Sequence, residues 1–333
     1  MRTEFKLLVI LSLLASPAIA GGNAGKAPKA TYFNITNLVS DQSGVAENTD
    51  PNLINPWGLS QASASSPLWV SDNGTGLSTV YAQGTGKNEN IVVTIPNGSP
   101  TGTVYVPAGA GFQITENGKS ADATFLFDSN TGYITGWNST VDAKNAVVAY
   151  SSTSSDFTGL AIDPTSKLLF AADNANNAVL VFDNTFTLKT SFTDSSLKDY
   201  SPYNVAVING AVYVTFVSFT KGKGYVDVFN ESGTLQKQLI KKGQLDLPWG
   251  LAVAPSTFGK YAGALLVGNL ANGHINAYNI STGAHLGTLS TAKGAPIAID
   301  GLWSLDAAPS GDITFSAGPN GYGDGLIGLI AAN

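Results

Sequence analysis

Short runs of alternating apolar and polar or small residues recur along almost the whole chain. Leu168–Asp173 and Ala178–Phe182 are two such runs, and an asparagine-rich turn separates them. Runs of this kind are rich in β-branched and aromatic residues and are bounded by glycine, asparagine or proline, as strands are. No segment has a sustained helical period of apolar residues. The pattern therefore predicts an all-β fold.

A motif of four residues repeats six times along the chain. It consists of proline, a residue that is often aromatic, glycine or asparagine, and an apolar residue from which a strand continues. The copies are Pro56–Leu59, Pro100–Thr103, Phe157–Leu160, Pro202–Val205, Pro248–Leu251 and Ile299–Leu302. Their third positions, at residues 58, 102, 159, 204, 250 and 301, lie 44, 57, 45, 46 and 51 residues apart. Propeller blades have comparable periods of roughly 40 to 50 residues.

The intervals between the copies predict four-stranded blades. Three further strands follow each of the first five copies of the motif, whereas only two follow the sixth copy before the chain ends at Asn333. A spare strand, Tyr32–Val39, precedes the first copy. We therefore predict a six-bladed β-propeller in which this N-terminal strand is the outer strand of the last blade, because a closed ring leaves only short, protected edges. The alternative is an open sandwich or two β domains, which the near-even spacing disfavours.

Two resemblances agree with this interpretation. Thr158–Asp183, which covers most of the third unit, resembles an NHL repeat. The whole mature chain also resembles an uncharacterised family of secreted bacterial β-propeller proteins, through the segments Asn55–Gly58, Phe125–Trp137, Leu247–Ala252 and Ile299–Trp303. This resemblance implies a propeller fold and export, and it implies no particular activity.

The N-terminus has the features of a secretory signal peptide. Arg2 and Lys6 are followed by the apolar run Leu7–Leu14 and by the small residues around Ala20. We therefore expect a signal peptide at residues 1–20, a flexible mature N-terminus at 21–31, a single propeller domain at 32–333, and a secreted or periplasmic location. The apolar run is too short for a convincing membrane span, and no later segment qualifies.

Composition narrows the chemistry further. The net charge is −6 and lysine and arginine are scattered, so binding to nucleic acid by phosphate neutralisation is disfavoured. The chain has no cysteine and only two histidines, His274 and His285. Thiol nucleophiles and cysteine-ligated zinc are therefore excluded, and a conventional catalytic triad would have to use one of these histidines. We expect a monomer.

The blade starts provide the candidate site, because they face one mouth of the central channel in a propeller. Aligning the six motif copies predicts a ligand-binding ring at this mouth, formed by Trp57, Thr101, Thr158, Tyr203, Trp249 and Asp300. Aromatic rings could stack on a sugar or a peptide there, or they could simply plug the channel and pack between blades. Alternatively, Asp300, Asn204 and Asn55 could supply oxygen ligands to Ca²⁺.

These observations leave several functions open. The leading hypothesis is a non-catalytic scaffold that binds a small molecule, a glycan or a protein, because no complete catalytic set is evident. The second is a metal-dependent hydrolase, since Asp300 and Asn204 stand at places similar to those of the metal ligands in lactonases of the gluconolactonase type. Asn55 stands where those enzymes have a glutamate, which weakens the likeness. The third hypothesis is a carbohydrate-binding propeller that uses Trp57, Tyr203 and Trp249.

Overall fold

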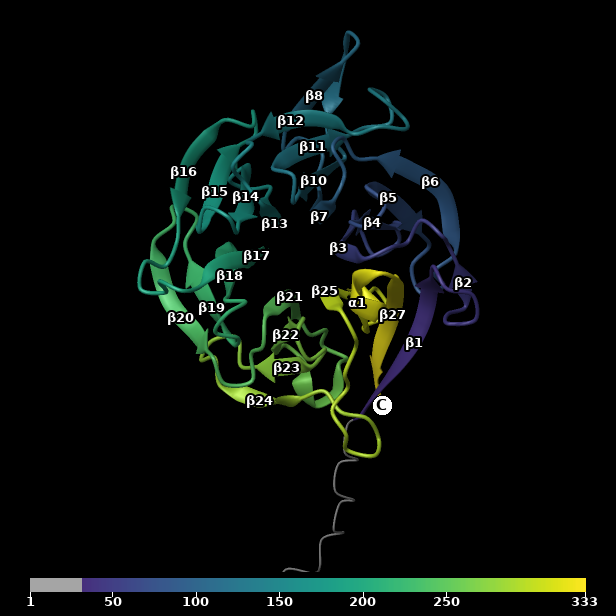
Figure 1. Ribbon diagram of the computed structural model, residues 1–333, viewed down its shortest axis with the longest axis vertical. Coiled ribbons are helices and arrows are strands. Elements are labelled where there is room, and N and C mark those ends of the chain that lie inside the picture. The colour runs from purple at the N-terminus through teal and green to yellow at the C-terminus, as the bar shows by residue number, and fades with distance from the viewer. Residues whose placement is uncertain (1–31) are drawn as a thin grey trace, which may run out of the picture. The chain divides into compact units, whose positions relative to one another are not determined.

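A computed structural model describes residues 32–333, and these residues form six β-sheets arranged as the blades of a propeller (Figure 1). Each of the first five blades is a four-stranded antiparallel sheet. The predicted fold class is therefore confirmed. The predicted signal peptide and the predicted flexible segment at 21–31 lie outside the described residues. Within residues 32–333, no helix is long and apolar enough to cross a membrane.

The blades follow one another along the chain, and in blades 1–5 the first strand is innermost. Blade 1 contains β3 (Pro56–Gln61), β4 (Leu68–Asp72), β5 (Leu77–Tyr81) and β6 (Asn88–Thr94); blade 2 contains β7 (Pro100–Tyr105), β10 (Phe125–Ser129), β11 (Tyr133–Trp137) and β12 (Val147–Ser151). Blade 3 contains β13 (Phe157–Asp163), β14 (Leu168–Asp173), β15 (Ala178–Asp183) and β16 (Leu188–Phe192); blade 4 contains β17 (Ser201–Ile208), β18 (Ala211–Val217), β19 (Gly224–Phe229) and β20 (Leu235–Lys241). Blade 5 contains β21 (Pro248–Val253), β22 (Leu265–Asn269), β23 (Ile275–Tyr278) and β24 (His285–Thr288).

The last blade is completed by the N-terminal strand, as predicted. It contains β25 (Leu302–Ala307), β26 (Ile313–Ala317), β27 (Leu326–Ala332) and β1 (Phe33–Ser40), with the short β2 (Asn48–Thr49) at its edge. The strands β1 and β27 are antiparallel partners and lie side by side in Figure 1. The Phe33 ring packs on Phe258 and Tyr261 of the preceding blade, with ring centroids 4.9 and 5.8 Å apart. Hydrogen bonds and apolar contacts therefore close the ring together.

Close approach of the inner strands explains why glycine recurs in the motif. A Cβ atom on Gly58 would lie 2.6 Å from the carbonyl oxygen of Thr101 in the next blade. A Cβ atom on Gly102 would lie 2.5 Å from the backbone nitrogen of Leu160 in the blade after that. Neither backbone atom can move away cheaply, so a side chain at these positions would force neighbouring blades apart.

An inserted hairpin accounts for the long second interval of the repeat. Strands β8 (Gln113–Glu116) and β9 (Lys119–Asp122) pair with each other between the first two strands of blade 2. Their turn residues Asn117 and Gly118 both have positive φ, at 50° and 77°. Asn-Gly is the typical sequence of such a two-residue hairpin turn.

The sixth copy of the motif was misaligned by three residues in the sequence analysis. In blade 1, Pro56 pairs with Asp72 and Leu59 pairs with Val70, with a bulge between them. The same bulged pairing occurs in blade 6 between Leu302 and Ala317 and between Leu305 and Phe315. The sixth copy is therefore Leu302–Leu305, and Trp303 takes the place that was assigned to Asp300.

The apolar core lies mainly between neighbouring blades. Trp69 of blade 1, for example, stacks on Phe125 of blade 2 with ring centroids 4.3 Å apart, and both side chains are buried. The two short helical segments, η1 (Gly259–Tyr261) and α1 (Pro319–Tyr322), lie in loops between strands. Since every blade packs on its neighbours, the inner strands are held as the wall of a central channel.

Candidate functional site

Four aromatic side chains close the channel where the inner strands begin. We call Trp57, Tyr203, Trp249 and Trp303 the aromatic plug. Trp57 stacks on Trp303 with ring centroids 3.5 Å apart, and Trp249 meets both rings edge-on at 6.1 and 6.0 Å. Tyr203 lies 6.2 Å from both Trp57 and Trp303. The four residues come from blades 1, 4, 5 and 6, so the plug joins distant parts of the ring.

Burial of the plug decides between two of the sequence-based interpretations. Trp57, Tyr203 and Trp249 are 7%, 5% and 3% exposed, and Trp303 is 2% exposed. The indole nitrogen of Trp249 donates to the carbonyl oxygen of Thr158 at 2.8 Å. The aromatic side chains of Trp57, Tyr203 and Trp249 thus lie together as expected, but their faces are covered and a sugar could not stack on them. They close the channel, and the carbohydrate-binding hypothesis at this mouth loses its basis.

Of the other three residues predicted to bind a ligand at this mouth, Thr101 and Thr158 are buried and Asp300 is exposed. Thr101 and Thr158 are 0% and 2% exposed. The Thr101 hydroxyl lies 2.7 Å from a carboxylate oxygen of Asp128, and the Thr158 hydroxyl donates to the carbonyl oxygen of Ala172. Asp300 is exposed, and its carboxylate accepts a hydrogen bond from the backbone nitrogen of Asn320 at 2.9 Å. Asp300 therefore stays outside the plug, consistent with the shifted alignment.

The predicted metal ligands are occupied by internal hydrogen bonds. The Asn55 side-chain oxygen accepts from the Trp303 indole nitrogen at 2.9 Å. The Asn204 side-chain oxygen accepts from the backbone nitrogen of Val205 at 2.8 Å, and its amide nitrogen donates to the carbonyl oxygen of Trp249. Residues 32–333 also contain no group of three or more His, Asp or Glu side chains that could hold a metal ion. This donor set does not fit Ca²⁺, which requires six to eight free oxygen ligands.

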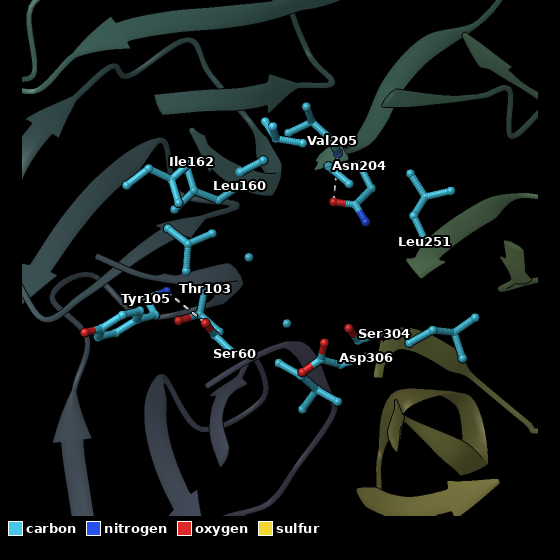
Figure 2. Close-up of a pocket in the computed structure, with 18 of the residues that line it drawn as sticks. Ser60, Thr103, Tyr105, Leu160, Ile162, Asn204, Val205, Leu251, Ser304 and Asp306 are labelled. Carbon is cyan, nitrogen blue, oxygen red and sulfur yellow. Dashed lines mark hydrogen bonds between the residues drawn. The ribbon is translucent and has the colours of Figure 1, made fainter. Parts of the chain in front are cut away.

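The other half of the channel is open. All six inner strands contribute their second halves to a cavity of about 340 Å³, and Trp249 of the plug lies at its floor. Ser60, Val104, Ile162, Ala206, Leu251 and Asp306 line the cavity and are partly exposed, whereas the residues nearer the plug are buried. Figure 2 shows side chains from several blades converging on this space. The mouth that offers a ligand site is therefore opposite to the predicted one.

The cavity has a polar side and an apolar side. Ser60 and Gln61 of blade 1 lie next to Ser304 and Asp306 of blade 6, and the Gln61 amide donates to the carbonyl oxygen of Ala307 at 3.0 Å. Leu160 and Ile162 of blade 3 lie across the cavity from Asp306 (Figure 2). Val205, Ala206 and Val207 of blade 4 and Leu251 of blade 5 continue this apolar side, which also contains the buried polar residue Asn204. A bound molecule would therefore meet polar atoms on one side and hydrocarbon on the other.

Among the residues that the structure describes, Asp306 is the only charged one that lines the cavity. Burial among the surrounding protein atoms raises the pKa of its carboxyl group to about 6, and the nearby backbone N–H of Ala307 offsets this slightly. Among residues 32–333, no lysine or arginine forms an ion pair with Asp306. Asp306 lies near the end of β25, whereas the predicted site comprised residues at the starts of the inner strands, so the sequence pattern did not single it out.

Comparisons with known proteins place the chain among viral relatives. A protein of Acanthamoeba polyphaga mimivirus, Uncharacterized protein R648, is 30% identical over 329 residues, which cover 90% of this chain and 80% of that protein. The chain belongs to the R648 family. Uncharacterized protein L690 of the same virus is 29% identical over 328 residues, covering 90% of this chain and 85% of that protein. No protein-family model matches the chain.

These relatives bear on two of the earlier expectations. The R648-family members found are viral proteins, so they lend no support to the bacterial origin that the sequence resemblance implied.

Among solved structures, a chain of the nidogen/laminin complex has a TM-score of 0.55 and covers 83% of this chain and 98% of its own length. At 11% sequence identity, this likeness shows the propeller fold alone.

Proposed function

We propose that this protein is a non-catalytic binding propeller whose ligand site is the open half of the central channel. The observation that carries the proposal is a cavity of about 340 Å³ that all six blades wall and that the aromatic plug closes at one end. Small-molecule sites are typically concave, largely apolar and equipped with a few convergent polar groups. The channel is concave and combines apolar side chains with several convergent polar groups, and its closed floor would hold a ligand rather than let it pass through.

The lining residues favour binding over catalysis. They include one carboxylate, Asp306, and no histidine, cysteine, lysine, arginine or glutamate. General acid–base catalysis usually needs a second titratable group, or a nucleophile that is hydrogen-bonded to a base. Ser60 does not provide that pair, because within residues 32–333 its hydroxyl group accepts from the backbone nitrogen of Tyr105 at 2.8 Å and forms no hydrogen bond to a base. The hydrolase alternative is therefore less well supported than binding.

A thermal-shift screen of soluble small molecules tests the proposal. Each compound is assayed in parallel on the wild type and on an Ile162→Trp variant, in which a larger side chain fills the mouth of the cavity. A ligand that binds only the native state raises the melting temperature in proportion to its saturation. We expect stabilising compounds to lose their effect in the variant. Compounds that stabilise both proteins equally would show that binding takes place elsewhere.

We also propose that the protein acts outside the cytoplasm. The support is the N-terminal sequence pattern of Arg2, Lys6 and the apolar run Leu7–Leu14. Mass spectrometry of the full-length protein expressed in a bacterium with its own N-terminus tests this proposal. A mature chain beginning at Gly21 in the exported fraction would support it. An intact N-terminus in the cytoplasmic fraction would contradict it.

A further inference from the structure

We infer that the channel selects a small organic cation, namely an amine whose ammonium group pairs with Asp306 and whose hydrocarbon body lies against the apolar wall of blades 3 to 5. This inference rests on the proposed function and names the class of ligand for the same site. It follows from how charge and hydrocarbon are distributed around the cavity.

The carboxylate of Asp306 lacks a cationic partner. It points toward the cavity in Figure 2, and the described residues provide no ion pair for it. Its neighbours in the lining, Ser60, Gln61 and Ser304, are neutral. A carboxylate that is partly withdrawn from water and unpaired carries an energetic cost, which an incoming cation offsets by a charge-assisted hydrogen bond.

The opposite wall sets the second requirement on the ligand. Ile162, Val207 and Leu251 present partly exposed hydrocarbon to the cavity, and the side chains of Leu160 and Val205 are buried behind them. A fully hydrated inorganic cation would gain nothing from such a wall. One carboxylate is also too few oxygen ligands for Ca²⁺. An amine with an apolar body satisfies both sides of the cavity at once.

The size of the cavity limits the ligand to a small molecule. About 340 Å³ is near the lower end of the usual range of small-molecule pockets, which is roughly 300 to 1,000 Å³. The plug prevents a longer molecule from threading through the channel. A compound with one aromatic or branched aliphatic group and a short aminoalkyl arm matches these limits.

Three compounds of similar size separate the contributions of charge and hydrocarbon. They are 2-phenylethylamine, which is a cation at neutral pH, 2-phenylethanol, which is neutral, and phenylacetate, which is an anion. Their affinities are measured by isothermal titration calorimetry in low-salt buffer at pH 7.5, on full-length protein. We expect the amine to bind at least tenfold more tightly than the alcohol, and phenylacetate to bind more weakly than both.

Two aspartate variants provide the matched comparison. Asp306→Asn removes the charge and keeps the side-chain shape, and it should weaken amine binding about 10- to 100-fold, which is the value of a hydrogen bond to a charged group. The same variant should leave the affinity for the alcohol within about twofold. Asp300→Asn makes the same chemical change on the exposed aspartate outside the plug, and it should alter neither affinity. A melting temperature close to that of the wild type confirms that each variant is folded.

The possible outcomes separate this inference from the proposed function. If the amine and the alcohol bind equally and Asp306→Asn changes neither, the channel is a binding site but the selection of cations is wrong. If none of the three compounds binds the wild type, the selection of amines is wrong, and the thermal-shift screen alone decides whether the channel binds another ligand. If they bind the wild type and Ile162→Trp leaves their binding unchanged, the channel is not the ligand site and both proposals fail.

Discussion

A buried aspartate in blade 4 predicts an unusual dependence of stability on pH. Asp227 lies on β19 and is 0% exposed, and neither of its carboxylate oxygens has a hydrogen-bond donor from a nitrogen or hydroxyl group. Burial, together with the neighbouring carboxylate of Asp194, raises the pKa of Asp227 to about 8. Burial acts on Asp194 as well, but hydrogen bonds from Gln238 and Ser196 hold the pKa of Asp194 below its usual value. Asp227 is therefore the protonated member of the pair at neutral pH.

The size and sign of the effect follow from this difference in pKa. Between about pH 4 and pH 8, native Asp227 holds a proton that the unfolded chain has lost, so the free energy of unfolding falls as the pH rises. The slope is about 1.4 kcal/mol per pH unit, and the total is about 5 kcal/mol by pH 8. This is a large share of the usual stability of a domain, about 5 to 15 kcal/mol.

Replacing Asp227 with asparagine removes this dependence. The asparagine side chain stays neutral, and its amide can donate a hydrogen bond to the Asp194 carboxylate. We therefore expect Asp227→Asn to be more stable than the wild type by an amount that grows with pH and reaches about 4 kcal/mol at pH 7. Guanidinium denaturation followed by tryptophan fluorescence, at several pH values from 4 to 9, measures the difference between the two proteins.

The difference between the proteins is the decisive quantity, because other buried carboxyl groups titrate in both. Asp199→Asn changes an exposed aspartate of the same blade region and serves as the control, with no pH-dependent difference expected. If the difference between Asp227→Asn and the wild type is constant from pH 5 to pH 8, Asp227 does not carry a raised pKa. A variant that is less stable at every pH would show that the native pair needs a second carboxyl group.

Three further predictions concern the plug, the motif and the channel. Trp303→Ala removes the ring that stacks on Trp57 and should lower the free energy of unfolding by about 3 to 5 kcal/mol, as measured by calorimetry. A change below about 1 kcal/mol would contradict a structural role for the plug. Gly102→Ala should lower the melting temperature by several degrees, because its Cβ atom would lie 2.5 Å from the Leu160 backbone nitrogen. Gly323→Ala should cost much less, because its φ is −81° and its Cβ atom would come no nearer than 3.2 Å to another residue. The affinity for 2-phenylethylamine should fall about tenfold for each pH unit below pH 6, because the pKa of Asp306 is raised to about 6 and protonation removes its charge. Calorimetric titration at pH 5 and pH 7.5 measures this change. An affinity that is the same at both pH values would show that Asp306 is not the partner of the amine.

Much of the fold was predictable because its signals are local. Alternation along each run and turn residues between runs identified the blades, and the spare strand at Tyr32–Val39 identified the closure of the ring. The inserted hairpin of blade 2 was missed although Asn117-Gly118 is a typical hairpin turn. The sixth copy was misplaced because Ile299–Leu302 contains a glycine before an apolar residue, whereas the true copy has Leu302 in place of proline and Ser304 in place of glycine.

The site was less predictable because it depends on packing across the ring. The sequence placed Trp57, Tyr203 and Trp249 together correctly, but whether their rings stay open depends on Trp303, which reaches them from the misaligned blade. Which mouth of the channel remains open is decided by side chains of all six inner strands at once. No local pattern marks Asp306 as the charged residue of the cavity, and none marks Asp227 as a buried acid.

A crystal structure of the protein soaked with 2-phenylethylamine would test the central claim most directly. We expect electron density for one molecule in the open half of the channel, with its nitrogen about 2.7 to 2.9 Å from a carboxylate oxygen of Asp306 and its ring against Ile162. A channel that holds only water, with the amine bound on an outer blade surface, would contradict the assignment of the channel as the ligand site.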